Sequence, residues 1–225
     1  MNKTHIVGNW KSNKTIDQAR EWLDQFRFKI EDLRFKNENI EIVICPAFIH
    51  LPLFSAYIQK HHLPLKLAAQ DISPFGEGAF TGAVAGSMLE GIVSYVLIGH
   101  SERRTHFGET DEILAQKVSQ AKQHGIEPIY CVSDVGMEIP SGVTIAAYEP
   151  VWAIGSGTAE TPDNANEVCK TLKEKSGASV ALYGGSVTGE NASQFTQREY
   201  IDGVLPGGAS LEVDTFIRLI QAISV

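Results

Sequence analysis

The residue best placed for acid–base chemistry is Glu149, which ends the short apolar run Ile145–Tyr148. Runs of this kind form buried parallel strands, and such sheets carry their functional groups at the carboxyl ends of the strands. The stiff segment Pro150–Trp152 and the small residues Ala153–Thr158 come next, a pattern typical of a rigid hinge carrying a mobile flap. A base under a closing flap suits proton abstraction from a small substrate.

The other polar candidates also stand where apolar runs end. These are Asn9, Lys11, His100, the turn Tyr183–Ser186 and the pair Gly207-Gly208. Each has an ordinary alternative explanation: a solvated lysine, a histidine bonded to loop backbone, a simple glycine turn. The segment Glu102–Arg104 alone would indicate a structural ion-pair cluster. Their coincidence at strand ends favours one shared site.

Strand-like and helix-like segments alternate along the whole chain, which predicts an α/β fold. The expected strands lie within His5–Lys11, Glu41–Pro46, Leu65–Asp71, Tyr95–His100, Pro128–Ser133, Thr144–Pro150, Ser179–Gly185 and Asp202–Gly207. Their Val, Ile and Leu content without alternation indicates parallel strands covered on both faces. Eight such units favour a closed (β/α)8 barrel over an open sheet, with residues 1–225 as a single domain.

The connecting segments include amphipathic helices. In Thr15–Phe28 one face is apolar, with Ile16, Ala19, Trp22, Leu23 and Phe26 on it. Further helices are expected over Asp111–His124, Pro162–Lys175 and Val213–Ile223. The fifth connection, Ser133–Val143, is short and rich in Gly and Pro, so we expect a turn or irregular loop there instead of a full helix.

Composition restricts the function. The chain has 225 residues, 43% of them apolar, and a net charge of −8, which argues against a nucleic-acid partner. No apolar run is long enough to span a membrane and no signal peptide is apparent, so a cytoplasmic location is expected. Cys45, Cys131 and Cys169 are expected to be reduced and buried, and the absence of zinc-type spacing predicts no metal site.

Six motifs occur in order: N-x-K, AFTG, GHSERR, AYEPVWAIG-x-G, YGGSV and GGASL. With them the chain resembles the triosephosphate isomerase family over nearly its whole length. The resemblance implies interconversion of dihydroxyacetone phosphate and D-glyceraldehyde 3-phosphate through an enediolate, in glycolysis and gluconeogenesis. It implies a phosphorylated triose as substrate and no cofactor.

The same resemblance implies residue roles. Glu149 would be the base, His100 the neutral electrophile, and Lys11, with Asn9 beside it, the group that stabilises negative charge. Glu102 would stand behind them as a partner of Lys11. Burial against apolar groups would raise the pKa of Glu149.

Supporting roles follow from the same motifs. Main-chain N–H groups would bind the phosphate, those of Gly155, Ser186, Gly207 and Gly208, near a short helix begun by Ala209-Ser210-Leu211. Ser101 would hold the resting Glu149, Tyr183 would support its glycine turn, and Ile154 and Leu205 would supply apolar cover. Two departures from the family pattern, Thr158 and Pro206, concern the flap and the phosphate cup.

The long glycine-rich segment Asp71–Ala83 resembles the family's intersubunit loop. By that resemblance it would carry Phe75 and Phe80 into a neighbouring subunit and bring Thr81 near that subunit's Asn9 and Lys11. A homodimer is therefore expected, with a tetramer as the alternative. Exposing both phenylalanines in a lone barrel would be unfavourable.

Two rival interpretations remain open at the level of sequence. Another phosphate-binding barrel isomerase would share the glycine cup, although GHSERR together with YEPVWAIG is not expected there. A non-catalytic binding or adhesion barrel would retain the shell without turnover. The shortened fifth unit keeps that second interpretation open.

Overall fold

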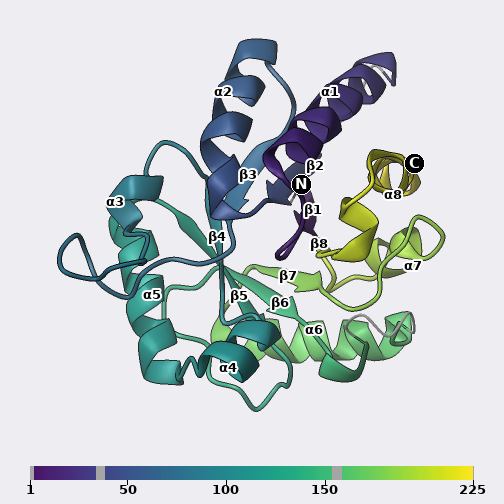
Figure 1. Ribbon diagram of the computed structural model, residues 1–225. Helices are drawn as coiled ribbons and strands as arrows, with labels where there is room; N and C mark the ends of the chain where they lie inside the picture. Colours follow the sequence, from purple (N-terminus) through teal and green to yellow (C-terminus); the bar gives the residue numbers. More distant parts are fainter. Residues whose placement is uncertain (1–2, 34–38, 154–158, 225) are drawn as a thin grey trace.

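The eight-stranded barrel expected from the sequence is present. A computed structural model describes residues 3–33, 39–153 and 159–224, and in it eight parallel strands pair in chain order and close into a barrel (Figure 1). The strands are β1 (Thr4–Asn9), β2 (Ile40–Cys45), β3 (Lys66–Ala69), β4 (Tyr95–Ile98), β5 (Glu127–Val132), β6 (Ile145–Tyr148), β7 (Val180–Tyr183) and β8 (Gly203–Val204). Each lies in or beside its predicted segment, so all eight carboxyl ends meet at one mouth.

Helices surround the barrel (Figure 1). They are α1 (Ile16–Asp32), α2 (Leu51–His61), α3 (Gly86–Leu89), α4 (Ser101–Phe107), α5 (Asp111–Gln123), α6 (Pro162–Ser176), α7 (Ala192–Thr196) and α8 (Val213–Ile223), with 3-10 turns η1 (Phe48–His50), η2 (Val151–Ala153) and η3 (Gly208–Ser210). None of the helices within the described residues is long and apolar enough to cross a membrane.

Local sequence sets the helix ends. Thr15 caps α1 and forms a reciprocal capping box with Gln18, while Thr161 caps α6 and Pro162 occupies its first turn. The buried residues of α1 begin at Ala19, and Ile16, at the start of the same apolar face, is 40% exposed.

The fifth connection contains no helix, as predicted. Between β5 and β6 the chain runs through turns and bends over residues 133–143. Val135, Met137 and Ile139 pack against the core, and the Met137 sulfur accepts hydrogen bonds from the main chain and hydroxyl of Ser133, both at 3.3 Å. Alternate apolar side chains of an irregular loop therefore cover part of the barrel here.

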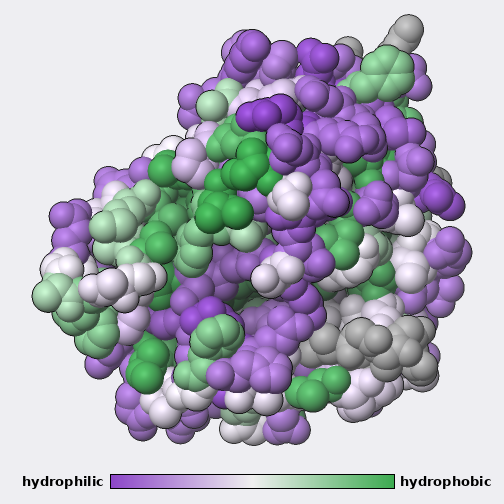
Figure 2. Space-filling model, viewed as in Figure 1, coloured by the Kyte–Doolittle hydropathy of each residue, from purple (hydrophilic) through white to green (hydrophobic). Residues whose placement is uncertain are grey.

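The segment between β3 and α3 projects from the side of the barrel (Figure 1). It contains Phe75 and Phe80, which stack with ring centroids 4.4 Å apart and are 46% and 42% exposed. Figure 2 shows apolar surface along this projecting edge. The protein thus holds two stacked aromatic rings in solvent-accessible positions, as the sequence indicated.

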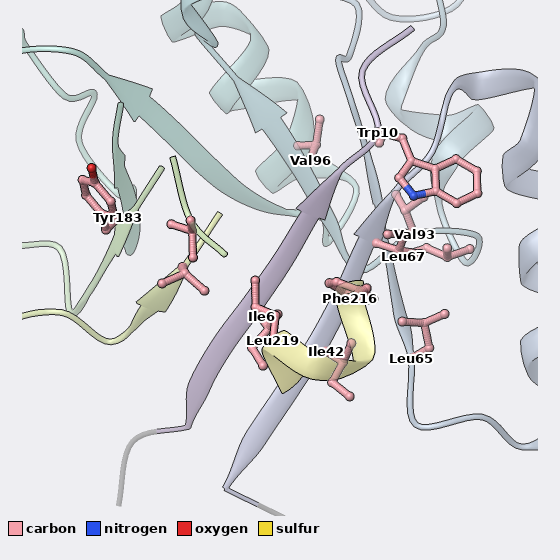
Figure 3. Packing of buried hydrophobic residues seen from close by; sticks show 14 of the residues in the cluster. Ile6, Trp10, Ile42, Leu65, Leu67, Val93, Val96, Tyr183, Phe216 and Leu219 are labelled. Atoms are coloured by element: carbon pink, nitrogen blue, oxygen red, sulfur yellow. The ribbon is translucent and has the colours of Figure 1, made fainter. Parts of the chain in front are cut away.

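The apolar core has two layers. Inside the barrel lies a cluster that includes Val7, Val43, Leu97 and Leu182. The outer layer fills the space between strands and helices, where Phe216 and Leu219 of α8 lie near Ile6 and Ile42 (Figure 3). Aromatic rings dominate one sector of this outer layer: Trp22 stacks on Phe26 at 4.9 Å.

The cysteines Cys45, Cys131 and Cys169 are unpaired and buried, which confirms the prediction made for them.

This layering predicts opposite outcomes for two phenylalanines of α1. Phe26 is fully buried, whereas Phe28 is 72% exposed. Phe26→Ala leaves a cavity and loses the Trp22 stack, so it should lower the free energy of unfolding by about 3–5 kcal/mol. Phe28→Ala should change it by less than about 0.5 kcal/mol. Urea denaturation followed by tryptophan fluorescence measures both, and similar losses in the two variants would contradict this assignment of the core.

Candidate active site

Glu149 lies immediately beyond β6 and is almost completely buried, with an exposed fraction of 2%. Its main-chain N–H donates to the Val132 carbonyl at 2.8 Å, which extends the β5–β6 ladder to the barrel mouth. On the other side lies Gly184, where an added Cβ would stand 2.8 Å from the Glu149 Cγ. Only glycine therefore leaves room for this side chain.

Burial raises the pKa of Glu149, because the charged carboxylate loses water. His100, the main-chain N–H of Ser101, Lys11 and the Cys131 thiol oppose the rise in pKa by favouring the charged form. Oε2 of Glu149 is buried and has no hydrogen bond of good geometry within the described part of the chain. A carboxylate with a raised pKa and an unengaged oxygen is suited to accept a proton.

His100 faces this carboxylate. Its Nε2 lies 3.2 Å from Glu149 Oε1. At the N-cap of α4 its Nδ1 accepts the main-chain N–H of Glu102 at 3.2 Å, so Nδ1 carries no proton. The hydrogen-bond pattern therefore assigns a neutral imidazole with its proton on Nε2. In this structure that proton is directed toward the Glu149 carboxylate.

Lys11 is held in an unusual backbone conformation. Its φ of 54° is in the left-handed region, which non-glycine residues rarely adopt. The Lys11 N–H donates to Asn9 Oδ1 at 3.0 Å, and its Nζ lies 2.6 Å from Glu102 Oε1. The main-chain N–H of Asn9 in turn donates to the Pro206 carbonyl at 2.9 Å. These contacts fix an ammonium group at the mouth of the barrel.

A cavity of about 620 Å³ brings most of the predicted residues together. Those that line it are Asn9, Lys11, His100, Glu149, Ser186, Leu205, Gly207 and Gly208. Residues from both ends of the chain thus share one hollow, with acid–base groups on one side and glycine-rich backbone on the other. The short helix expected at Ala209 begins one residue earlier, as η3.

The remaining predicted residues divide into three groups. Glu102, Ser101 and Tyr183 do not line the cavity, and Glu102 forms an ion pair with Lys11. Thr81, Phe75 and Phe80 lie on the projecting segment and do not line the cavity. Ile154, Gly155 and Thr158 fall outside the described residues. No cluster of potential metal ligands occurs in the part of the chain that the structure describes.

Two residues near the site were not found from the sequence. The Gln70 side chain donates to the carbonyls of Lys11 and Cys45, at 2.9 and 2.8 Å, and so secures the strained backbone of Lys11. Cys131, on β5, contributes the thiol beside Glu149. Both lie near the carboxyl end of a predicted strand, which is the one signal that could have identified them.

Comparison with known proteins gives a consistent result. The family model described as triosephosphate isomerase matches residues 4–223. The chain belongs to the triosephosphate isomerase family. Curated relatives named triosephosphate isomerase include one from Mesomycoplasma hyopneumoniae (strain 232), 38% identical over 241 residues, covering 97% of this chain and 98% of the relative. Another, from Picosynechococcus sp. (strain ATCC 27264 / PCC 7002 / PR-6), is 39% identical over 244 residues, covering 98% and 99%.

Membership of the triosephosphate isomerase family agrees with the closed barrel of eight parallel strands. The comparison with the M. hyopneumoniae relative extends over 241 residues, whereas this chain has 225. The relative therefore contains residues that this chain lacks. Family membership does not itself assign the roles of the side chains, which depend on the geometry described above.

The buried carboxylate predicts a pH-dependent stability difference. Because the folded-state pKa of Glu149 is raised, its charge destabilises the fold once the pH exceeds the unfolded value of about 4.3. Glu149→Gln removes that charge and keeps an acceptor for His100. The variant should be more stable than the parent at pH 8, on the order of 1 kcal/mol, and the difference should vanish as the pH falls toward 4. Urea midpoints at several pH values measure this, and a constant difference would refute a raised pKa.

Proposed function

We propose that this protein is a triose-phosphate isomerase that interconverts dihydroxyacetone phosphate and D-glyceraldehyde 3-phosphate. The observation that carries the proposal is the convergence of Lys11, His100 and Glu149 on one cavity, with His100 Nε2 only 3.2 Å from the Glu149 carboxylate. An amine, a neutral imidazole and a buried carboxylate are the groups that proton transfer beside a carbonyl requires.

Each group has a distinct step in this proposal. Glu149 accepts a proton from the carbon beside the carbonyl, and the C–H electron pair forms the C=C bond of an enediolate. The carbonyl π electrons move to oxygen, where the Nε2–H of His100 donates a hydrogen bond and then the proton. The His100 ring then regains a proton from the hydroxyl on the carbon that lost its hydrogen, where the O–H electron pair forms the new C=O bond. Glu149 returns its proton to the carbon of the former carbonyl. Lys11 stabilises the negative charge that develops. The reaction moves protons within one molecule, so it needs no redox cofactor.

The phosphate of the substrate would bind at the glycine-rich side of the cavity. Gly207, Gly208 and Ser186 line that side, and a Cβ at Gly208 would meet no other atom within 4 Å. Backbone N–H groups in such open loops can approach an anion closely. With Lys11 nearby, they would provide positive potential on a chain of net charge −8.

We also propose that two copies of this chain associate through the projecting segment. Support comes from the stacked rings of Phe75 and Phe80, which remain 46% and 42% exposed. A second copy would remove both from water, and Thr81 would then reach the neighbouring site. A tetramer is the alternative assembly. The three cysteines form no disulfide with one another, which supports a cytoplasmic location.

The role of Glu149 can be tested by shortening its side chain. Glu149→Asp withdraws the carboxylate by one methylene, so kcat should fall by about two to three orders of magnitude. A coupled assay with glyceraldehyde 3-phosphate measures it. Glu167→Asp, on the exposed face of α6, is the matched control and should retain the parental kcat. Equal rates in Glu149→Asp and parent would exclude Glu149 as the base.

The proposed association can be tested at the stacked rings. Replacing both Phe75 and Phe80 with serine removes the apolar surface that a partner would cover, so the variant should sediment as a monomer at micromolar concentration. Phe28→Ser removes an exposed phenylalanine from α1 and should leave the sedimentation coefficient unchanged. If the double variant sediments like the parent, the projecting segment does not hold the assembly together.

A further inference from the structure

Glu160 lies between β6 and α6 and makes three hydrogen bonds to different elements. Its Oε2 accepts from the Tyr148 hydroxyl at 2.8 Å, and its Oε1 accepts from the side-chain amide of Asn164 in the first turn of α6. Its main-chain N–H donates to the Tyr183 hydroxyl at 2.9 Å. One residue therefore connects the ends of β6 and β7 to the start of α6.

The hydrogen bond between the Glu160 carboxylate and the Tyr148 hydroxyl bears on the position of Glu149, the candidate base. Tyr148 is the last residue of β6 and directly precedes Glu149. Tyr148 is 7% exposed, and a buried hydroxyl without a partner is costly, so its hydroxyl needs the Glu160 carboxylate. The main chain of β6 continues directly into Glu149. A displaced Tyr148 ring would consequently move the carboxylate relative to His100.

The hydrogen bond from the Glu160 main-chain N–H to the Tyr183 hydroxyl lies beside the turn Gly184–Ser186, where the substrate phosphate would bind. Tyr183 is fully buried, stacks on Phe195 at 4.1 Å, and directly precedes Gly184. A Cβ at Gly185 would stand 2.1 Å from the Tyr183 hydroxyl oxygen, so the tyrosine lies directly against the turn. The Glu160 N–H fixes the hydroxyl in this place. This contact does not depend on the side chain at position 160.

We propose that Glu160 is a positioning residue: its carboxylate, bound to the Tyr148 hydroxyl, orients the end of β6 that carries Glu149. The inference rests on the proposed function, since it presumes that Glu149 is the base. It adds a residue that touches neither substrate nor cavity. The bond to Tyr183 uses the main-chain N–H, so a side-chain substitution at position 160 should leave it in place.

The test compares Glu160→Ala with Glu160→Gln. Alanine leaves the Tyr148 hydroxyl without its acceptor, so kcat should fall about tenfold. The inhibition constant of inorganic phosphate should stay within about twofold, because the N–H to Tyr183 remains. Glutamine retains an acceptor oxygen and should restore kcat to within about twofold. Glu167→Ala, exposed on α6, is the control and should retain the parental kcat.

Tyr148→Phe removes the same bond from the other side and carries the test if Glu160→Ala does not fold. It should lower kcat by the same factor, and the kcat of the double variant should be no lower than that of either single variant, since all three lack the bond between Tyr148 and Glu160. An unchanged kcat in Glu160→Ala or Tyr148→Phe, failure of glutamine to restore kcat, or weakened phosphate binding would overturn the inference. A parent protein without isomerase activity would instead refute the proposed function.

Discussion

The arrangement of the site depends on the burial of one carboxylate beside one neutral imidazole. Removing Glu149 from water disfavours its charge, and this effect outweighs the favourable interactions with His100, Lys11 and the Ser101 N–H. A base must nevertheless be charged to act, so the surrounding groups have to compensate for most of the lost hydration. The protonation state of His100 contributes to this balance, because a proton on Nε2 donates toward the carboxylate without adding a positive charge to the ring.

No local structure could assemble these groups. Lys11 follows β1, His100 follows β4, and Glu149 follows β6, and none of these strands pairs with another of the three. They come within contact of one cavity because the sheet closes and all its carboxyl ends face the same way. The closed barrel is therefore the condition for the site. Strained positions such as Lys11, with φ of 54°, persist because the Asn9 and Gln70 side chains bind its backbone on both sides.

The elements that depend on local sequence pattern could be predicted from the sequence. The strands followed from apolar runs, the start of α6 from Thr161 and Pro162, and the missing fifth helix from glycine and proline between Ser133 and Val143. Gln70, Cys131 and Glu160 could not be identified in this way as residues that support the site, because their partners belong to other elements of the barrel. Such contacts depend on register and side-chain direction across the barrel, and no periodicity along one segment encodes them. Ile16 lies on the apolar face of α1 and is 40% exposed, since a helical stripe does not show where the covered surface begins.

The short fifth connection is compatible with the positions of Lys11, His100 and Glu149, because the two depend on different bonds. Cys131 pairs with Ala147 and Val132 with Tyr148 in the β5–β6 ladder, and the Glu149 N–H continues that register to the Val132 carbonyl. The position of Glu149 is therefore set by main-chain hydrogen bonds between the strands. A helix on the outer surface would add apolar burial without changing this register. Its replacement by a loop should consequently affect the free energy of unfolding before it affects the chemistry at the mouth.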